Sequence, residues 1–398
     1  MDWHFKKLKE IAVIKGRIGW KGLKRSEFSK QGVLIINGPN IIDGRVDWQN
    51  CLRIPFWRYQ ESMEISVKVS DILVTKDGTI GKTAYIKSLR EPATLASGIF
   101  LIRSQETQIL IQDFLYQYFK SPLFRKFVVS RTEGSVIPHL YQRDIEDLVV
   151  PVPPLLEQKA IAKILSDIDS KIELNTQMNR TLEAIAQTIF KRWFIDFEFP
   201  NGEGKPYKSS GGEMVDSERG EIPRRWSIKS IDTVAEFLNG LPLQKYAISE
   251  GEDYLPIIKI RELNNGISES TDKASVNIPK NYIVEDGDVL FSWSGTLGIV
   301  LWGHGKGALN QHLFKVTSKA YPKWFYYYWL RHYLSSYIDI AKDKATTMGH
   351  IQRHHLSESS VAVPDSETLE YMVLQRILWH GYNSSGCHSS LIMTEIKL

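Results

Sequence analysis

The sequence predicts an α+β protein with two similar domains, each a curved β-sheet with helices, joined by a long coiled-coil-like helix. Three observations predict this: the two halves of the chain share motifs, each half mixes strand and helix patterns, and the stretch between them has an uninterrupted helical periodicity. The 398 residues are 42% hydrophobic and 24% charged, which is typical of a soluble globular protein with two or three domains.

The clearest repeat is a strand that runs into a Gly-Thr turn. Asp71–Gly81 and Asp288–Gly298 both read as Asp, three apolar residues, a polar or aromatic stretch, and Gly-Thr-apolar-Gly. Five further pairs recur in the same order: Trp3, Leu8 and Ile11 with Trp226, Ile231 and Val234; Asn40–Gly44 with Glu262–Gly266; Phe114–Lys120 with Phe325–Arg331; Ile137–Leu140 with Met348–Ile351; and Val150–Pro153 with Val361–Pro364. Chance similarity explains this order poorly, so residues 1–153 and 222–364 are predicted to be two copies of one domain.

Each copy mixes two periodicities. Apolar and β-branched runs predict strands at Val67–Val74, Thr83–Ile86, Gly98–Arg103 and Leu309–Thr317. Aromatic-rich amphipathic helices are predicted at residues 109–128 and 323–342.

The strongest helix signal lies between the copies, at residues 154–199. Pro154 suits the first turn of a helix, and neither Gly nor Pro follows before Phe199. Apolar residues recur mostly at steps of three and four, as in a coiled-coil seam: Ile161, Leu165, Ile168, Ile172, Met178, Leu182, Ile185 and Ile189. Roughly 35 helical residues make a rod of about 50 Å. Asn175 either sets the register of this seam or is an ordinary surface residue.

Two segments flank the second copy. Residues 200–221 are rich in Gly, Ser, Pro and charge, which predicts a flexible linker. Residues 365–398 begin as a helix and then lose the helical pattern in a Gly-, Ser- and Asn-containing stretch.

The sequence lacks the usual catalytic motifs. Gly81-Lys82-Thr83 resembles the end of a phosphate loop, but Lys76 occupies the position of the required glycine. His350, His354 and His355 have no carboxylate or cysteine at ligand spacing, so solvated or DNA-facing histidines are favoured over a metal site.

Net charge, cysteine content and targeting signals limit the classes of protein to which the chain can belong. The net charge of +4 permits nucleic-acid binding without requiring it, and Cys51 and Cys387 build no disulfide framework. The start of the chain has no signal-peptide pattern and no run is long enough to span a membrane, so we expect a cytoplasmic protein.

A duplicated chain without a catalytic constellation is best interpreted as a binding protein, and sequence-specific DNA binding fits two recognition domains separated by a spacer. The alternatives are a self-contained DNA-modifying enzyme and a coiled-coil adaptor or scaffold without nucleic acid.

Polar and basic residues in predicted loops are the candidates for DNA contact. For each one alone a solvated surface role is the commoner explanation, so they are predictions as a set. In the first copy they are Lys21, Lys24, Arg25, Lys76, Thr79, Lys82, Arg131, Ser135 and His139. In the second copy they are Lys245, Arg261, Trp293, Ser294, Lys306, Gln311, His350 and Arg353.

Several of these motifs together resemble the specificity subunit of type I restriction–modification systems over nearly the whole chain to about residue 370. They are Val150–Ala162, Leu165–Ile172, Phe190–Phe194, Gly134–Leu140, and Gly220–Pro223 with Trp226. The resemblance implies two target-recognition domains that each read one half of a split site on double-stranded DNA. It also implies two long antiparallel helices that fix the gap between the half-sites.

The resemblance further implies the partners and cofactors. Two methyltransferase (M) subunits would dock on the helices with S-adenosylmethionine and methylate adenine. Restriction (R) subunits would add cleavage and translocation with ATP and Mg. This chain itself would bind no cofactor or metal and would not be an enzyme. After Pro364 the family has a second long helix, and residues 365–398 depart from it. We therefore expect the helix seam to be covered by partner docking or by self-association.

Overall fold

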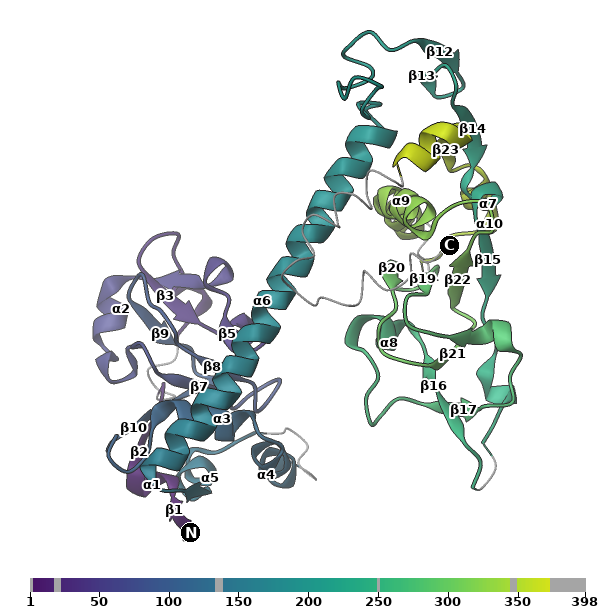
Figure 1. Ribbon diagram of the computed structural model, residues 1–398. Helices are drawn as coiled ribbons and strands as arrows, with labels where there is room; N and C mark the ends of the chain where they lie inside the picture. The colour runs from purple at the N-terminus through teal and green to yellow at the C-terminus, as the bar shows by residue number, and fades with distance from the viewer. Residues whose placement is uncertain (1–2, 18–22, 133–138, 249–250, 344–348, 373–398) are drawn as a thin grey trace. The chain divides into compact units, whose positions relative to one another are not determined.

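The computed structural model describes residues 3–17, 23–132, 139–248, 251–343 and 349–372 (Figure 1). The chain forms two compact units, Met1–Thr176 and Gln177–Leu398. Helix α6 (Leu155–Phe194) is continuous and contributes residues to both units. None of the helices in the described ranges combines the length and apolar character needed to span a membrane.

The first unit contains an antiparallel sheet of four strands in the order β2-β10-β7-β8, a sheet β6-β3-β9 in which β3 and β9 are parallel, and the small pairs β1–β11 and β4–β5. Its strands are β1 (His4–Lys7), β2 (Ala12–Gly16), β3 (Val33–Ile36), β4 (Ile41–Ile42), β5 (Arg45–Val46), β6 (Leu52–Ile54), β7 (Ile72–Thr75), β8 (Thr83–Tyr85), β9 (Ala93–Leu95), β10 (Ile99–Ser104) and β11 (Val149–Val152). Its helices before α6 are α1 (Leu8–Ile11), α2 (Phe56–Gln60), α3 (Gln112–Lys120), α4 (Pro122–Thr132) and α5 (Gln142–Glu146), with short 3-10 turns η2 (Arg25–Glu27), η3 (Gly38–Asn40), η4 (Trp48–Asn50) and η5 (Met63–Ile65).

The second unit repeats this plan. Its sheets have the orders β15-β22-β19-β20 and β17-β16-β21-β18, with β16 and β21 parallel, beside the pairs β14–β23 and β12–β13. The strands are β12 (Met214–Ser217), β13 (Gly220–Pro223), β14 (Ser227–Ser230), β15 (Glu236–Asn239), β16 (Tyr254–Ile258), β17 (Lys273–Ser275), β18 (Ile283–Val284), β19 (Val289–Ser292), β20 (Gly298–Leu301), β21 (Gly307–Leu309), β22 (Leu313–Thr317) and β23 (Ser360–Val363). The helices are α7 (Ile231–Val234), α8 (Ile260–Asn265), α9 (Lys323–Asp343) and α10 (Arg353–Ser357), with 3-10 turns η6 (Leu243–Lys245) and η7 (Lys280–Tyr282).

The equivalence extends to individual backbone contacts. His4 pairs with Val152 in β1–β11, and Ser227 pairs with Val363 in β14–β23, at the same register. The next helix starts with the same bond in both copies, since the Leu8 and Ile231 amides each donate 2.8 Å to a carbonyl before the closing strand. The predicted fold class, two similar α+β domains with a long helix, is confirmed.

The middle strands of each main sheet are buried on both faces. In β7, Ile72 and Val74 pack in the cluster that contains the aromatic residues of α3 and α4. Leu73 points to the opposite cluster with β3 and β9. In β19, Phe291 packs beneath α9 and Leu290 packs on the other side. Side chains alternate between the faces of a strand, so burial on both sides produces the apolar runs seen in the sequence.

The prediction of one helix over residues 109–128 is wrong. The chain forms α3 and α4, separated at Ser121, which is extended with a ψ of 158°. Pro122 is the reason, because a residue before proline avoids the helical region. The second domain has no proline at this place, and α9 runs unbroken for 21 residues.

Two predicted strands are shorter than expected. Strand β7 begins at Ile72, because Ser70 has a positive φ of 71° and the Asp71 carboxylate caps the Lys68 amide in a turn. The strand predicted over Leu309–Thr317 is split into β21 and β22 by a loop at residues 310–312.

The predicted flexible linker is instead part of the second unit. Helix α6 ends at Phe194 rather than at Phe199, and residues 214–223 form the β12–β13 hairpin. Phe199 is buried and stacks on Tyr207 at 4.6 Å and on Trp226 at 5.1 Å between ring centroids. These aromatic contacts order a segment whose composition alone indicates flexibility.

One of the predicted repeats is only partly retained. Asn40–Gly44 leads into the β4–β5 hairpin, whereas Glu262–Gly266 lies on α8 and its C-cap. The shared feature is the start, where the side chains of Asn40 and Glu262 each accept a hydrogen bond from the backbone amide three residues earlier.

Candidate nucleic-acid interface

Each Gly-Thr turn is closed by a hydroxyl at the end of the preceding strand. The Thr75 hydroxyl donates to the Thr79 carbonyl at 2.6 Å, and the Ser292 hydroxyl donates to the Thr296 carbonyl at 2.7 Å. A glycine with positive φ stands at the same place in both turns, Gly78 at 66° and Gly295 at 65°, a conformation that glycine adopts without a steric penalty.

The repeated histidine segment docks on each turn. The Leu140 amide donates to the Lys76 carbonyl at 3.1 Å, and the Ile351 amide donates to the Trp293 carbonyl at 3.0 Å. Segments about sixty residues apart in the sequence are thereby joined into one surface in each domain. We name these surfaces the first turn site, residues 76–82 with His139, and the second turn site, residues 293–298 with His350.

The first turn site is rich in charge. The Lys76 ammonium lies 4.9 Å from the centroid of the Phe100 ring, and Thr79 and Lys82 are exposed. The His139 ring pairs with the Asp77 carboxylate and lies edge-on to Tyr141 at 4.8 Å. This site therefore offers an ammonium group, a hydroxyl and an imidazole to a ligand.

The second turn site replaces the charge with aromatic and imidazole groups. Trp293 occupies the position of Lys76, and its indole N–H donates to Asn239 at 3.0 Å. The Trp293 ring centroid lies 5.9 Å from those of Phe314 and His312. Ser294 is only 5% exposed and its hydroxyl lies 3.1 Å from the His312 ring, so this candidate supports His312 instead of offering a free contact.

Gln311 borders the second turn site close to His350. The Gln311 amide nitrogen lies 3.4 Å from the His312 ring, and His350 pairs with Ser294 in an isolated bridge. Both side chains are half-buried. Amide and imidazole groups of this kind form hydrogen bonds with base edges.

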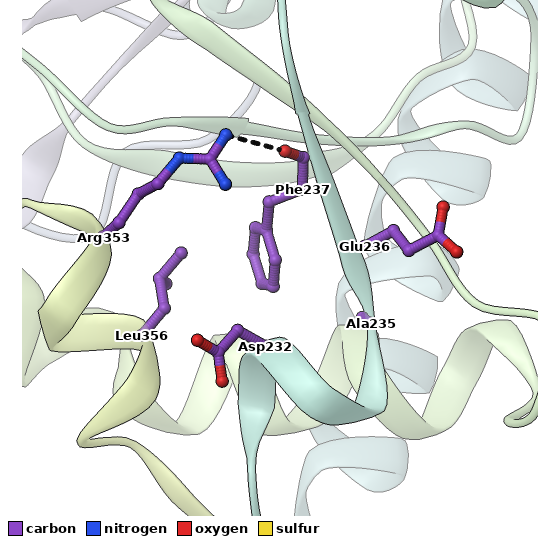
Figure 2. Close-up of a pocket in the computed structure, with 6 residues that line it drawn as sticks. All are labelled: Asp232, Ala235, Glu236, Phe237, Arg353 and Leu356. Carbon is purple, nitrogen blue, oxygen red and sulfur yellow. Dashed lines mark hydrogen bonds between the residues drawn. The ribbon is translucent and has the colours of Figure 1, made fainter.

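Arg353 lies at the side of this site, on α10. Its guanidinium donates to the Phe237 carbonyl at 3.3 Å (Figure 2) and lies 5.6 Å from the Phe314 ring centroid. In the first domain Gln142 forms the matching bond to the Ile14 carbonyl at 3.4 Å. Arg353 therefore performs a framework role that an amide fills in the other copy.

The same arginine lines a shallow pocket of about 370 Å³ between α7, β15 and α10. Figure 2 shows the carboxylates of Asp232 and Glu236 among its lining residues. Two carboxylates in the lining, and a single guanidinium that already donates to a carbonyl, make this pocket a poor site for a phosphate. It therefore adds no anion-binding site to the turn.

The remaining candidates are dispersed. Lys24, Arg131 and Lys245 are exposed. Arg261 pairs with Glu262 on α8, whose Ile260 lies beside Gly295, and Lys306 pairs with Glu285. Two further candidates, Lys21 and Ser135, and the side chain of Arg25 lie outside the described residues. The structure thus gathers about half of the predicted contacts at the two turn sites.

Polar contacts attach helix α6 to each unit. Gln158 is buried and bonds to Ile111, Ile109 and Pro153, and Asp169 accepts from Lys120 and Gln117. Glu173 pairs with Arg45 in the first unit, and Glu183 accepts from Tyr327 and Tyr328 in the second.

Helix α6 also exposes several apolar residues. Leu165, Ile168, Ile172, Leu182 and Ile185 are 39%, 51%, 60%, 39% and 38% exposed, and we name them the apolar stripe. The flanking seam residues Ile161, Met178 and Ile189 are half-buried, and Asn175 is exposed. Apolar side chains exposed along a helix in this way are a candidate interaction face.

The sequence analysis missed two groups. Gln158 is fully buried and anchors α6 to its domain. Glu358 joins His354 and His355, with possible ligand atoms within 4.8 Å of one another, as the sole such group in the described ranges. The signal in the sequence was the spacing of His355 and His354, which precede Glu358 by three and four residues and so share one face of a helix. The His355 Nδ1 atom already accepts the Gln352 amide at 2.9 Å, which leaves its other nitrogen protonated in the neutral ring.

Comparisons with known proteins agree with this architecture. The family described as "Type I restriction modification DNA specificity domain" matches residues 1–184 and 223–380. The MjaIX type I restriction enzyme specificity subunit of Methanocaldococcus jannaschii is 24% identical over 93% of this chain and 84% of its own length. The MjaVIII specificity subunit of the same organism is 32% identical over 44% of this chain and 38% of its own length.

A solved structure shows the same fold. The type I restriction–modification S subunit of M. genitalium aligns with 96% of this chain and 92% of its own at a TM-score of 0.51 and 15% identity. The family match covers most of the chain, including both copies of the repeated domain. The chain therefore belongs to the type I restriction–modification specificity family, as a non-catalytic DNA target-recognition subunit.

Proposed function

We propose that each domain reads one half of a split double-stranded DNA site through its turn site and that helix α6 fixes the spacing of the halves. The observation that carries this proposal is the repeated turn geometry in two domains that share one helix of 40 residues. Forty residues correspond to about 60 Å, and half-sites one helical turn apart lie roughly 34–36 Å from each other. The helix is long enough for such a ruler.

We also propose that methyltransferase subunits dock on the apolar stripe. The stripe is exposed, whereas Asp169 and Glu183 of the same helix are engaged in hydrogen bonds to its own domains. S-adenosylmethionine would then be bound by those subunits, and ATP and Mg by restriction subunits. Self-association of this chain through the same stripe is the competing use of that surface.

Co-purification with a candidate methyltransferase subunit tests the function. The complex is expected to bind random duplex DNA in a salt-dependent way and to methylate adenines at one two-part sequence, mapped on genomic DNA. Filter binding of the chain alone and of the complex provides the comparison. Absence of salt-dependent binding in both would leave the coiled-coil adaptor as the explanation.

An insertion in α6 tests the ruler. Seven extra helical residues after Asn175 lengthen the helix by about 10 Å and preserve the heptad phase. Since base pairs are about 3.4 Å apart, the mapped spacer is expected to lengthen by about three base pairs. Asn175→Gln is the control without insertion, and an unchanged spacer in the insertion variant would refute the ruler.

Charge placed in the apolar stripe tests docking. Ile168→Lys with Ile172→Lys is expected to abolish co-purification, because desolvating a charge at an apolar contact is unfavourable. Lys163→Gln, an exposed and ion-paired position on the same helix, is the control and should leave co-purification intact. Light scattering at micromolar concentration separates the competing use: a monomer rules out self-association.

A further inference from the structure

Helix α4 packs directly against the first turn. Two methyl groups of Val128 lie 3.2 Å from the position that a Cβ on Gly81 would occupy. Val128 is buried in the main core of the domain, together with Phe124 of the same helix. The position of α4 beside the turn is therefore fixed by core packing.

The surface of α4 is basic. The helix contains no Asp or Glu, and Arg125, Lys126 and Arg131 are all exposed. None of these three cations forms an ion pair with any described residue, and the Arg131 guanidinium lies 5.6 Å from the Phe127 ring centroid. Surface cations without acidic neighbours are the usual ligands of a DNA backbone.

The helical geometry places two of these cations near the turn. Arg125 and Arg131 stand three residues before and three residues after Val128, on the side of α4 that meets Gly81. Lys126 is rotated by about 160° from Val128, on the opposite side of the helix. The two arginines therefore flank the contact with the turn, and Lys126 does not.

The charges that already belong to the turn have the same sign. Lys82 is exposed and Lys76 is half-buried on the Phe100 ring. The nearby carboxylate of Asp77 is paired with His139. Arginines on α4 would thus extend an existing cationic surface.

The second domain differs along the matching helix α9. At the spacing of the repeat, in which Phe114–Lys120 matches Phe325–Arg331, Arg125 and Arg131 correspond to Ser336 and Lys342. The Lys342 ammonium is paired with the Asp339 carboxylate at 3.2 Å. Two arginines without an acidic partner among the described residues are therefore a feature of α4 and not of the described part of α9.

We propose that Arg125 and Arg131 bind phosphate groups of the DNA backbone beside the first turn site. This inference rests on the proposed function of the turn sites. A guanidinium donates two parallel hydrogen bonds to a phosphate, which suits a positioning contact that carries no sequence information.

The experiment measures the salt dependence of random duplex DNA binding by the full chain, wild type and Arg125→Gln/Arg131→Gln. The slope of log affinity against log salt is expected to decrease in magnitude by about 1.8, since each lost phosphate contact removes about 0.9. Lys126→Gln is the matched control on the same helix and should leave the slope unchanged. Arg125→Lys/Arg131→Lys should keep most of the slope, because the charges remain.

The outcomes separate the two proposals. A wild-type chain that shows no salt-dependent binding overturns the proposed function and this inference with it. A wild-type chain that binds, with an unchanged slope for the double glutamine variant, overturns the inference alone. A circular dichroism spectrum that matches the wild type shows that the double glutamine variant is folded. Arg125→Gln alone is a second test of the inference and is expected to reduce the magnitude of the salt slope by about 0.9.

Discussion

The two domains share a framework and differ in the chemistry presented on it. Both close the Gly-Thr turn with a strand-end hydroxyl and dock a histidine segment on its carbonyl. Around that framework the first domain has Lys76, Lys82 and the basic helix α4, and the second has Trp293 and His312. Backbone hydrogen bonds preserve the fold, so the exposed side chains can differ between the two copies.

The domains also differ in how their opening tryptophans are covered. Trp226 is 6% exposed and lies 5.6, 5.6 and 5.1 Å from the rings of Phe194, Phe197 and Phe199. The equivalent Trp3 is 43% exposed and bonds to Glu157 at 3.0 Å. The same sequence position therefore belongs to the core in one copy and to the surface in the other.

The largest expected effect concerns this tryptophan pair. Trp226→Ala should destabilise the second domain by about 3–5 kcal/mol, as for other large aromatic truncations in cores. Trp3→Ala should cost about 1 kcal/mol or less, because its ring is already half in water. Guanidinium unfolding followed by circular dichroism measures both variants, and equal shifts would show that the two environments do not differ in energy.

The next effect separates base readout from backbone binding. Trp293→Ala is expected to weaken binding to the cognate site by about 1–3 kcal/mol, as for the loss of one base-edge contact, with the salt slope unchanged. Titration of labelled cognate and random duplexes at several salt concentrations measures this. Lys319→Ala, an exposed residue of the same domain, is the control, and an equal loss on random DNA would contradict a role in sequence readout.

A substitution in the first turn site should change the salt slope and leave the sequence preference unchanged. Lys82→Gln is expected to reduce the magnitude of the salt slope by about 0.9 and to leave sequence preference unchanged, because a phosphate contact carries no sequence information. The same titrations apply, with Lys163→Gln on α6 as the control. A change of preferred sequence would mean that Lys82 contacts a base.

A smaller effect tests the equivalence of Arg353 and Gln142. Arg353→Ala removes the hydrogen bond to the Phe237 carbonyl and should cost about 1 kcal/mol of unfolding free energy. Arg353→Gln should recover most of this loss, because Gln142 forms the same bond in the first domain. Thermal unfolding compares the two variants, and failure of glutamine to recover stability would argue against the equivalence.

The smallest effect is a pH dependence confined to the first domain. Hydrogen bonds from Lys9 and Lys7 lower the pKa of Asp147 to about 2. A lowered carboxyl pKa contributes stability above its ordinary value, near 3.8, and that contribution is lost as the pH falls from about 4 toward 2. Asp147→Asn should flatten the stability profile of the first domain in this range, and acid titration by circular dichroism measures it. An unchanged profile would show that these ion pairs contribute no measurable stability in this pH range.

Sequence analysis succeeded where the signal is local or repeated. The period of the apolar residues identified α6, and the recurring order of motifs identified the duplication and the turn of Asp71–Gly81. The single helix predicted over 109–128 is wrong at Pro122, because the amphipathic pattern continues across a proline that ends the helix before it. Sequence analysis also failed at residues 200–221, whose order depends on rings brought together by the fold.

What the sequence determined by itself is the plan: two related domains, a long helix with an apolar stripe, and glycines that permit the turns. These features arise from periodicities and backbone preferences that act within a few residues. Only the tertiary structure decided which partners meet, such as His139 with Asp77, Ser294 with His312, and Val128 with Gly81. Such contacts join residues from eighteen to about sixty positions apart, and their selection depends on how whole strands and helices pack, which no local pattern encodes.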